Sequence, residues 1–167
     1  MNDTYVEVMV DRKTSPFLGV AKIALYALSV VCFLLAFIGS GVFLVGAIAF
    51  AIIAYFVIPM FDLEYEYLYM DREISIDKIM SKEKRKHVYN VDLNKMEFMA
   101  PVTSHELDSY RTRNLKVYDY SSRKEDAKVY SIVYEAGAEG TVLVNIEPNG
   151  EMIRAIKNVF PRKVMDF

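Results

Sequence analysis

Four cations close together in the sequence are the residues best suited to bind a ligand. Lys82, Lys84, Arg85 and Lys86 fall within five positions, although the whole chain has a formal charge of −2. Clustered lysine and arginine attract the anionic headgroups of a bilayer at about 1 kcal/mol per charge. The cluster therefore predicts a contact with anionic lipid, and the alternative is a solvated hairpin end that binds nothing.

Other residue types offer little chemistry. His87 and His105 have no cysteine or carboxylate at the spacing of a metal site. Ser104, His105 and Glu106 have the side chains of a hydrolytic triad, but neighbours in one loop cannot adopt its geometry, and a capped surface turn fits them better. The seven glycines form no phosphate-binding loop. We therefore expect no enzyme, no metal and no cofactor, and the net negative charge argues against nucleic acid as a partner.

Two long apolar runs determine where the basic cluster can lie. Residues 17–38 and 41–61 contain one charge between them, that of Lys22. At about 1.5 Å per residue, each run is long enough to cross a hydrocarbon core of about 30 Å. The runs therefore predict a transmembrane helical hairpin over residues 17–61. Lys22 is expected to extend to the headgroups, and an intramembrane role is the alternative.

Basic residues near the first run predict the orientation of the chain. Arg12, Lys13 and Lys22 lie on its amino-terminal side, whereas the connection between the runs has no charge. The excess of lysine and arginine on the cytoplasmic side of spans places both the amino terminus and the following domain in the cytoplasm. We therefore expect a multi-pass protein of the cell membrane.

Residues 1–16 precede the first run as a juxtamembrane segment. Tyr5, Val8 and Met9 have helical spacing after candidate capping residues, which favours a short amphipathic helix on the membrane surface. The alternating valines of VEVMV support a strand instead. We expect the helix, with the strand as the alternative.

Residues 62–167 have the pattern of a folded β domain. Apolar and polar residues alternate in LEYEYLYM directly after Asp62, and six further strand-like segments follow, separated by turn-forming residues. Asp71, Arg72 and Glu73 are expected to form the first hairpin turn. Strict alternation in the fourth segment would place Met96, Phe98 and Ala100 on one side of the strand.

A helix closes the domain, and tyrosines fill its strands. Asn149 is expected to cap this helix and Pro161 to end it, with one apolar stripe that must pack on a sheet. Alternating tyrosines in half-buried strands usually pack in the core or at its rim. That expectation applies to Tyr65, Tyr67, Tyr69, Tyr118, Tyr120, Tyr130 and Tyr134.

This order of elements resembles the pleckstrin-homology (PH) fold. On residues 65–101, YEYLYMDREISIDKIMSKEKRKHVYNVDLNKMEFMAP, the chain is similar to an uncharacterised bacterial family of small two-span membrane proteins with a PH-like domain. The resemblance implies an α+β membrane protein, in which an N-terminal transmembrane helical hairpin precedes a PH-like seven-stranded antiparallel bent sheet or barrel with a C-terminal helix. That family usually has an Asn-Gly type pair where this chain has Asp71 and Arg72.

These features favour a membrane-anchored, non-enzymatic scaffold or regulatory module that presents its PH-like domain at the cytoplasmic membrane surface. Its expected partners are the lipid bilayer and another membrane or cytoplasmic protein, with a homo-oligomer as a further option. One alternative is an anionic-lipid sensor that acts through the basic turn Lys82–Lys86. The other is an accessory subunit of a transport assembly, in which Lys22 and Tyr26 line a polar path.

Overall fold

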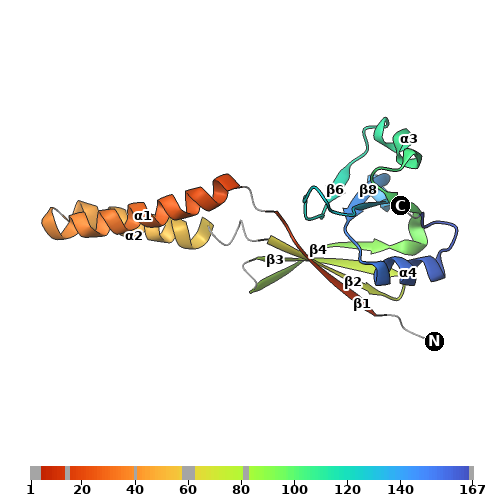
Figure 1. Ribbon diagram of the computed structural model, residues 1–167, viewed down its shortest axis with the longest axis horizontal. Coiled ribbons are helices and arrows are strands. Elements are labelled where there is room, and N and C mark those ends of the chain that lie inside the picture. The colour runs from red at the N-terminus through yellow and green to blue at the C-terminus, as the bar shows by residue number, and fades with distance from the viewer. Residues whose placement is uncertain (1–4, 14–15, 40, 58–62, 81–82, 166–167) are drawn as a thin grey trace. The chain divides into compact units, whose positions relative to one another are not determined.

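The chain forms two units, a helical pair and a β domain (Figure 1). The computed structural model describes residues 5–13, 16–39, 41–57, 63–80 and 83–165 of the 167-residue chain. The β domain comprises Met1–Arg12, Glu64–Ile79 and Arg85–Phe167, and the helical unit comprises Lys13–Leu63 with Met80–Lys84. The β domain is therefore assembled from both sides of the helical pair in the sequence.

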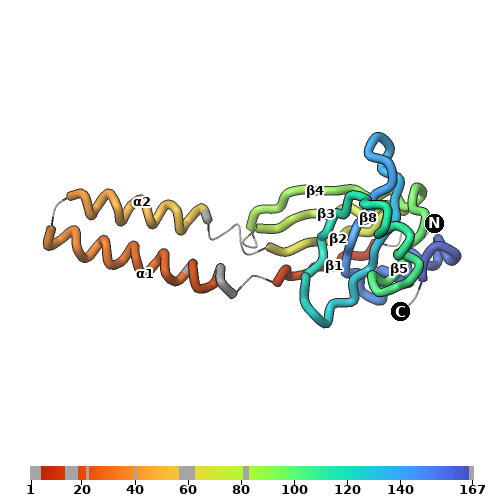
Figure 2. The backbone as a smooth tube through the Cα atoms, turned by 90° about the horizontal axis from the view of Figure 1, so that it is seen from above, coloured from red at the N-terminus to blue at the C-terminus, as the bar shows by residue number. Residues whose placement is uncertain are grey.

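The helical unit consists of α1 (Pro16–Ile38) and α2 (Val42–Val57), which lie side by side (Figure 2). The Ser29 hydroxyl of α1 donates a hydrogen bond to the carbonyl of Ala47 in α2, at 3.3 Å. Ala47 and Ala54 are buried, and small side chains of this kind let two helices approach closely. The larger apolar side chains of both helices point outward.

The predicted hairpin is confirmed only as a pair of apolar helices. Within the described residues, α1 is long and apolar enough to cross a membrane over Gly19–Ile38, whereas the apolar part of α2, Val42–Phe56, is shorter. The predicted second span of 41–61 includes positions outside the described residues. The side chain of Lys22 is also outside the described set, so its expected location stays a prediction.

The first sheet contains four strands in sequence order. They are β1 (Val6–Asp11), β2 (Leu63–Met70), β3 (Glu73–Met80) and β4 (Lys84–Asp92). β1 and β2 are antiparallel, and their register runs from Val6 opposite Tyr69 to Asp11 opposite Glu64. The two strands that flank the helical pair in the sequence are therefore neighbours in the sheet.

β1 corrects the expectation of an amphipathic helix in the juxtamembrane segment 1–16. Val6, Val8 and Val10 are buried in the main core, while the residues between them are exposed. Burial of one complete face against β2 outweighs the local helical spacing, because that burial removes three valine side chains from water. The β domain accordingly starts before the helices and not at residue 62.

The second sheet has the order β5-β7-β8-β6. Its strands are β5 (Met96–Pro101), β6 (Val117–Asp119), β7 (Tyr130–Glu135) and β8 (Thr141–Ile146). The seven strands expected after residue 62 are present as β2 to β8, but β6 pairs with β8 in parallel, so the expectation that all seven are antiparallel was wrong. β8 lies between β7 and β6 in the sheet. β6 is therefore the neighbour of β8 and not of β7, the next strand in the sequence.

A register shift in β5 changes which of its side chains share a side. The shift lies between Met96 and Phe98 where β5 pairs with β7. Met96 and Met99 consequently reach the main core, whereas Phe98 and Ala100 pack in a second apolar cluster on the other face of the sheet. The expectation that Met96, Phe98 and Ala100 lie together was therefore wrong, because one extra residue reverses the alternation.

The main core includes side chains of both sheets and of α4 (Gly150–Val159). Asn149 caps α4 by accepting a hydrogen bond from the Met152 amide at 2.8 Å, as predicted. Five of the seven tyrosines noted above are buried and the other two are half-buried, which confirms their core and rim positions. The shorter helices are η2 (Leu93–Lys95), η3 (His105–Leu107), α3 (Asp108–Arg111) and η4 (Gly137–Glu139).

The turn between β2 and β3 is tight, although neither of its residues is glycine. Asp71 and Arg72 form a two-residue connection and have φ angles of 50° and 65°. Positive φ at both positions is the geometry of the hairpin turn that usually contains Asn-Gly. A side chain with a Cβ atom pays about 1–2 kcal/mol for this conformation.

Replacement of Arg72 by glycine should therefore stabilise the β domain. We expect Arg72→Gly to raise the free energy of unfolding by about 0.5–1 kcal/mol, since the strain removed exceeds the chain entropy that glycine adds. Urea unfolding of the full chain in detergent, followed by near-ultraviolet circular dichroism of the core tyrosines, measures the change.

The matched control is Arg154→Gly on the exposed side of α4, where the arginine is helical. This change should lower the free energy of unfolding by about 1 kcal/mol. A loss of stability in Arg72→Gly as well would contradict the strain at the turn.

Candidate functional site: the outer face of the first sheet

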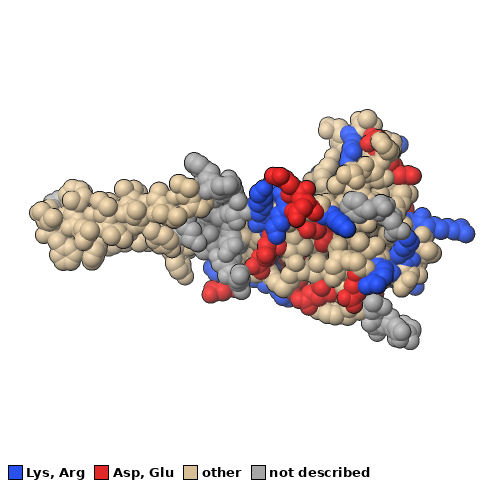
Figure 3. Space-filling view, viewed as in Figure 1, with Lys and Arg blue, Asp and Glu red and all other residues tan. Residues whose placement is uncertain are grey.

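The predicted basic cluster lies at the start of β4 and not on a turn. Lys84, Arg85 and Lys86 are exposed on this strand, and Lys82 lies outside the described residues. Because side chains of a strand alternate between its faces, Arg85 points away from the side shared by Lys84 and Lys86. Figure 3 shows cationic and anionic side chains interspersed on the visible surface of the β domain. On this face, the described cations therefore do not form one continuous patch.

Arg85 is held by a buried carboxylate. Its Nη2 atom donates a hydrogen bond to Oε1 of Glu66 in β2 at 2.7 Å. The Arg85 side chain is 57% exposed, whereas that of Glu66 is 1% exposed. Arg85 thus has a structural partner, and of the described cations in the cluster Lys84 and Lys86 remain as the stronger candidates for contact with anionic lipid.

Glu66 is unusual because one of its buried oxygens lacks a hydrogen bond. In the described part of the chain, Oε2 of Glu66 is the buried side-chain atom without a hydrogen-bond partner. Leaving such a group unsatisfied typically costs about 1–3 kcal/mol. If this carboxyl group were protonated, it could donate a hydrogen bond to a neighbouring acceptor, and that bond would reduce the cost of burying the oxygen.

Glu7 of β1 is that neighbour. Burial raises the pKa of Glu66, and the nearby Glu7 carboxylate raises it further because it can accept the proton of Glu66, whereas Arg85 opposes both effects. The Tyr5 hydroxyl donates to Oε2 of Glu7 at 2.7 Å, and this contact lowers the pKa of Glu7. The pKa of Glu66 is therefore raised while that of Glu7 is lowered, so Glu66 keeps its proton to a higher pH than Glu7 does.

The rest of this outer face is a ladder of polar contacts between β3 and β4. His87 Nδ1 lies 2.9 Å from Oδ1 of Asp77 and 3.3 Å from the Ser75 hydroxyl. Further along, the Asn90 side-chain amide donates to Oε2 of Glu73 at 3.0 Å. These contacts connect the two strands across one face, a geometry suited to electrostatic recognition of a partner.

The histidines and the triad-like residues make contacts with nearby polar groups. Among the described residues, no three His, Cys, Asp or Glu side chains are grouped so that they could hold a metal ion. The Ser104 hydroxyl caps η3 by accepting from the Glu106 amide at 3.4 Å, and His105 Nδ1 lies 3.2 Å from Asp108. The prediction of a capped surface turn is confirmed.

Sequence analysis missed Glu66 as a site residue. The alternation in LEYEYLYM correctly assigned Glu64 and Glu66 to the face opposite the tyrosines, and a polar face of this kind is ordinarily solvated. Both glutamates are in fact buried. The one available signal was the pairing of acidic positions in this strand with the basic run of β4, which becomes evident only when the two strands are placed in one sheet.

The pair of carboxyl groups predicts a specific pH dependence of stability. The raised pKa of Glu66 means that the folded protein binds this proton more tightly than the unfolded chain. The stability of the natural protein relative to Glu66→Gln should therefore be greatest at acidic pH and should fall as the pH rises through the folded-state pKa of Glu66. Thermal unfolding of both proteins between pH 4 and about pH 8 measures this difference.

Glu106→Gln is the control, since it removes an exposed carboxylate from η3, outside this network. Its stability relative to the natural protein should not follow the curve of Glu66→Gln. A constant difference between the natural protein and Glu66→Gln across this range would refute the sharing of a proton at this face.

Comparison with known proteins identifies one match. A family model described as "Bacterial PH-like domain (DUF6106)" matches residues 2–166. The matched range includes β1 and the helical pair as well as the following strands, so the insertion of the helices between β1 and β2 lies within the region that this model covers. Comparisons with curated proteins and with solved structures give no match.

Proposed function

Because the chain belongs to the bacterial PH-like domain family DUF6106, we propose that it is a membrane-anchored, non-enzymatic module that presents its β domain at the cytoplasmic surface of the cell membrane. The observation that carries this proposal is the exposure of α1. The side chains over Gly19–Ile38 are not buried in the protein, although they form the most apolar long helix described. PH-like domains suit such a role, because their fold can present binding surfaces without catalysing a reaction.

The surface of the helical pair requires an apolar solvent. Ile23, Phe37 and Ile38 of α1 are 71%, 78% and 86% exposed, and Tyr55 of α2 is 71% exposed. Water-soluble proteins rarely leave a continuous apolar surface of this extent uncovered. Hydrocarbon chains of a bilayer would cover it without loss of hydrogen bonds, because the backbone groups of a helix are satisfied within it.

The pairing of β1 with β2 supports two crossings over one. Strands that share a sheet must lie on the same side of a membrane, and β1 and β2 flank the helical pair. A chain that leaves and returns to the same side crosses an even number of times. If α1 spans the bilayer, the segment from α2 to β2 provides the return. The positive charges of Arg12 and Lys13 then favour the cytoplasm as the common side.

The connections to the helices support a role in presentation. Residues 12–15 join β1 to α1, and residues 58–62 join α2 to β2. The domain is therefore attached through two short connections, one before and one after the helical pair in the sequence. Two attachment points restrict rotation more than one, so a partner protein would meet a limited set of surfaces, among them the polar face of Glu66 and His87.

Membrane integration is tested by placing a charge in α1. We expect Leu28→Arg, near the centre of α1, to reduce the fraction of full-length protein that resists alkaline extraction of membranes, because arginine at that depth costs about 3 kcal/mol. Met70→Arg is the matched control, since Met70 is an exposed apolar residue of the β domain. Equal extraction of the two variants would argue that α1 lies outside the bilayer.

A photocrosslinking experiment distinguishes a protein partner from lipid. A photoreactive residue at Ser75, on the outer face of the first sheet, should give one discrete protein adduct in cells, whereas the same residue at Ser109 on α3 should not give that adduct. The doubly neutral variant Lys84→Gln, Lys86→Gln should retain the adduct. Formation of lipid adducts alone, lost in that variant, would instead favour the anionic-lipid sensor.

A further inference from the structure

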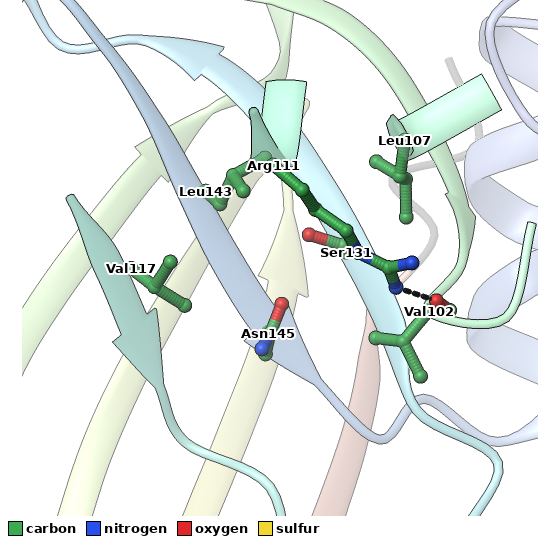
Figure 4. Close-up of a pocket in the computed structure, with 7 residues that line it drawn as sticks. All are labelled: Val102, Leu107, Arg111, Val117, Ser131, Leu143 and Asn145. Carbon is green, nitrogen blue, oxygen red and sulfur yellow. Dashed lines mark hydrogen bonds between the residues drawn. The ribbon is translucent and has the colours of Figure 1, made fainter. Parts of the chain in front are cut away.

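A pocket on the second sheet lies apart from the polar face described above. It has a volume of about 150 Å³ and lies between β6, β7 and β8 on one side and the segment with η3 and α3 on the other (Figure 4). At about 30 Å³ per water molecule, this volume corresponds to roughly five waters or to a ligand of similar size. All residues that line it belong to the β domain.

Three polar side chains point to the chemistry of a ligand. Among the described residues that line the pocket, Arg111 is the one with a charged side chain. Ser131 supplies a hydroxyl group and Asn145 supplies an amide. Ser131 and Asn145 are directly opposite in the pairing of β7 with β8, so their side chains lie on the same face as neighbours. Each of the three groups can donate a hydrogen bond.

Arg111 lines one part of the pocket. Figure 4 shows its side chain extending from α3 toward Val102, whose carbonyl oxygen accepts a hydrogen bond from Nη2. Nη1 lies 3.4 Å from Oδ1 of Asp108, a long and exposed contact. A guanidinium group has five N–H donors, so these two contacts leave donors for a bound acceptor. The side chain is 48% exposed, which makes the group accessible from solvent.

The other walls of the pocket are apolar. Leu107 and Leu143 are buried beside it, Val102 lies at the Arg111 end, and Val117 contributes a half-exposed side chain from β6. An aliphatic group of a few carbon atoms would replace water against these side chains favourably. A single cation with two neutral donors suits one planar carboxylate better than a phosphate group, which usually requires several cations or a row of backbone amides.

We propose that this pocket binds a carboxylate attached to a short branched aliphatic group, with Arg111, Asn145 and Ser131 as donors to the carboxylate. Such a group occurs in free branched short-chain acids and at the carboxy terminus of a peptide that ends in valine or leucine. The two sources share one chemistry, and a small volume with a single cation sets an affinity in the millimolar range or somewhat tighter.

The test is ligand binding to the full chain in lipid nanodiscs, measured by saturation-transfer NMR. Isovalerate should bind, and its neutral isostere isovaleramide should bind at least about tenfold more weakly, because a charge-assisted hydrogen bond is lost. A short acetylated peptide that ends in valine forms the second arm. Competition between the peptide and isovalerate shows one shared site, and the tighter of the two identifies the source.

Variants assign the binding to the pocket and separate it from partition into the bilayer. Arg111→Gln should weaken isovalerate at least about tenfold, and Asn145→Asp should do the same through repulsion between carboxylates. Asp108→Asn should bind equally well or better, because it removes a competing acceptor from Arg111. Arg113→Gln is the matched control, since Arg113 lies over the Tyr110 ring, and it should leave binding unchanged.

The outcomes are decisive in both directions. Equal binding of isovalerate to the natural protein, Arg111→Gln and Asn145→Asp would overturn the proposal, as would equal binding of isovaleramide or no binding at tens of millimolar. If Arg111→Gln fails to fold, Asn145→Asp is still expected to weaken binding, whereas Asp108→Asn is not. The lining residues of the pocket belong to the β domain, and their substitution does not change α1, so the proposal can fail while the proposed function holds.

Discussion

The antiparallel pairing of β1 with β2 is the interaction on which the rest of the molecule depends. It joins two segments that the whole helical pair separates in the sequence, and it buries the valines of β1 in the main core. Because Asp11 lies opposite Glu64, the end of β1 and the start of β2 are neighbours in the first sheet. The helices are thus an insertion into a β domain and not a preceding anchor.

The two faces of the first sheet have different roles because of strict alternation in β2. Tyrosines on the inner face fill the core with large side chains, and glutamates on the outer face support a ladder of charges and hydrogen bonds. The burial of Glu66 on that outer face makes the stability of the sheet depend on pH, since the carboxyl group that holds Arg85 in place has a raised pKa.

Local sequence patterns predicted the elements whose structure depends on neighbouring residues. They failed where contacts with distant segments determine the structure. The Asn149 cap and the two apolar runs are written in contiguous sequence, and each was predicted. β1 was expected to be a helix because its partner strand is remote, and the reversed alternation in β5 comes from a register shift that no residue type marks. The buried state of Glu66 and the pocket beside Arg111 arise from packing between segments, so periodicity alone could not reveal them.

The insertion of the helices between paired strands also fixes an order of biosynthesis. β1 leaves the ribosome before β2 has been synthesised. The pairing of these two strands can therefore form only after both helices have been synthesised. The same arrangement protects the finished molecule against release. A protease that cuts between α1 and α2 would leave two fragments that still share one sheet and one core, so a single cleavage would not free the domain from its helices.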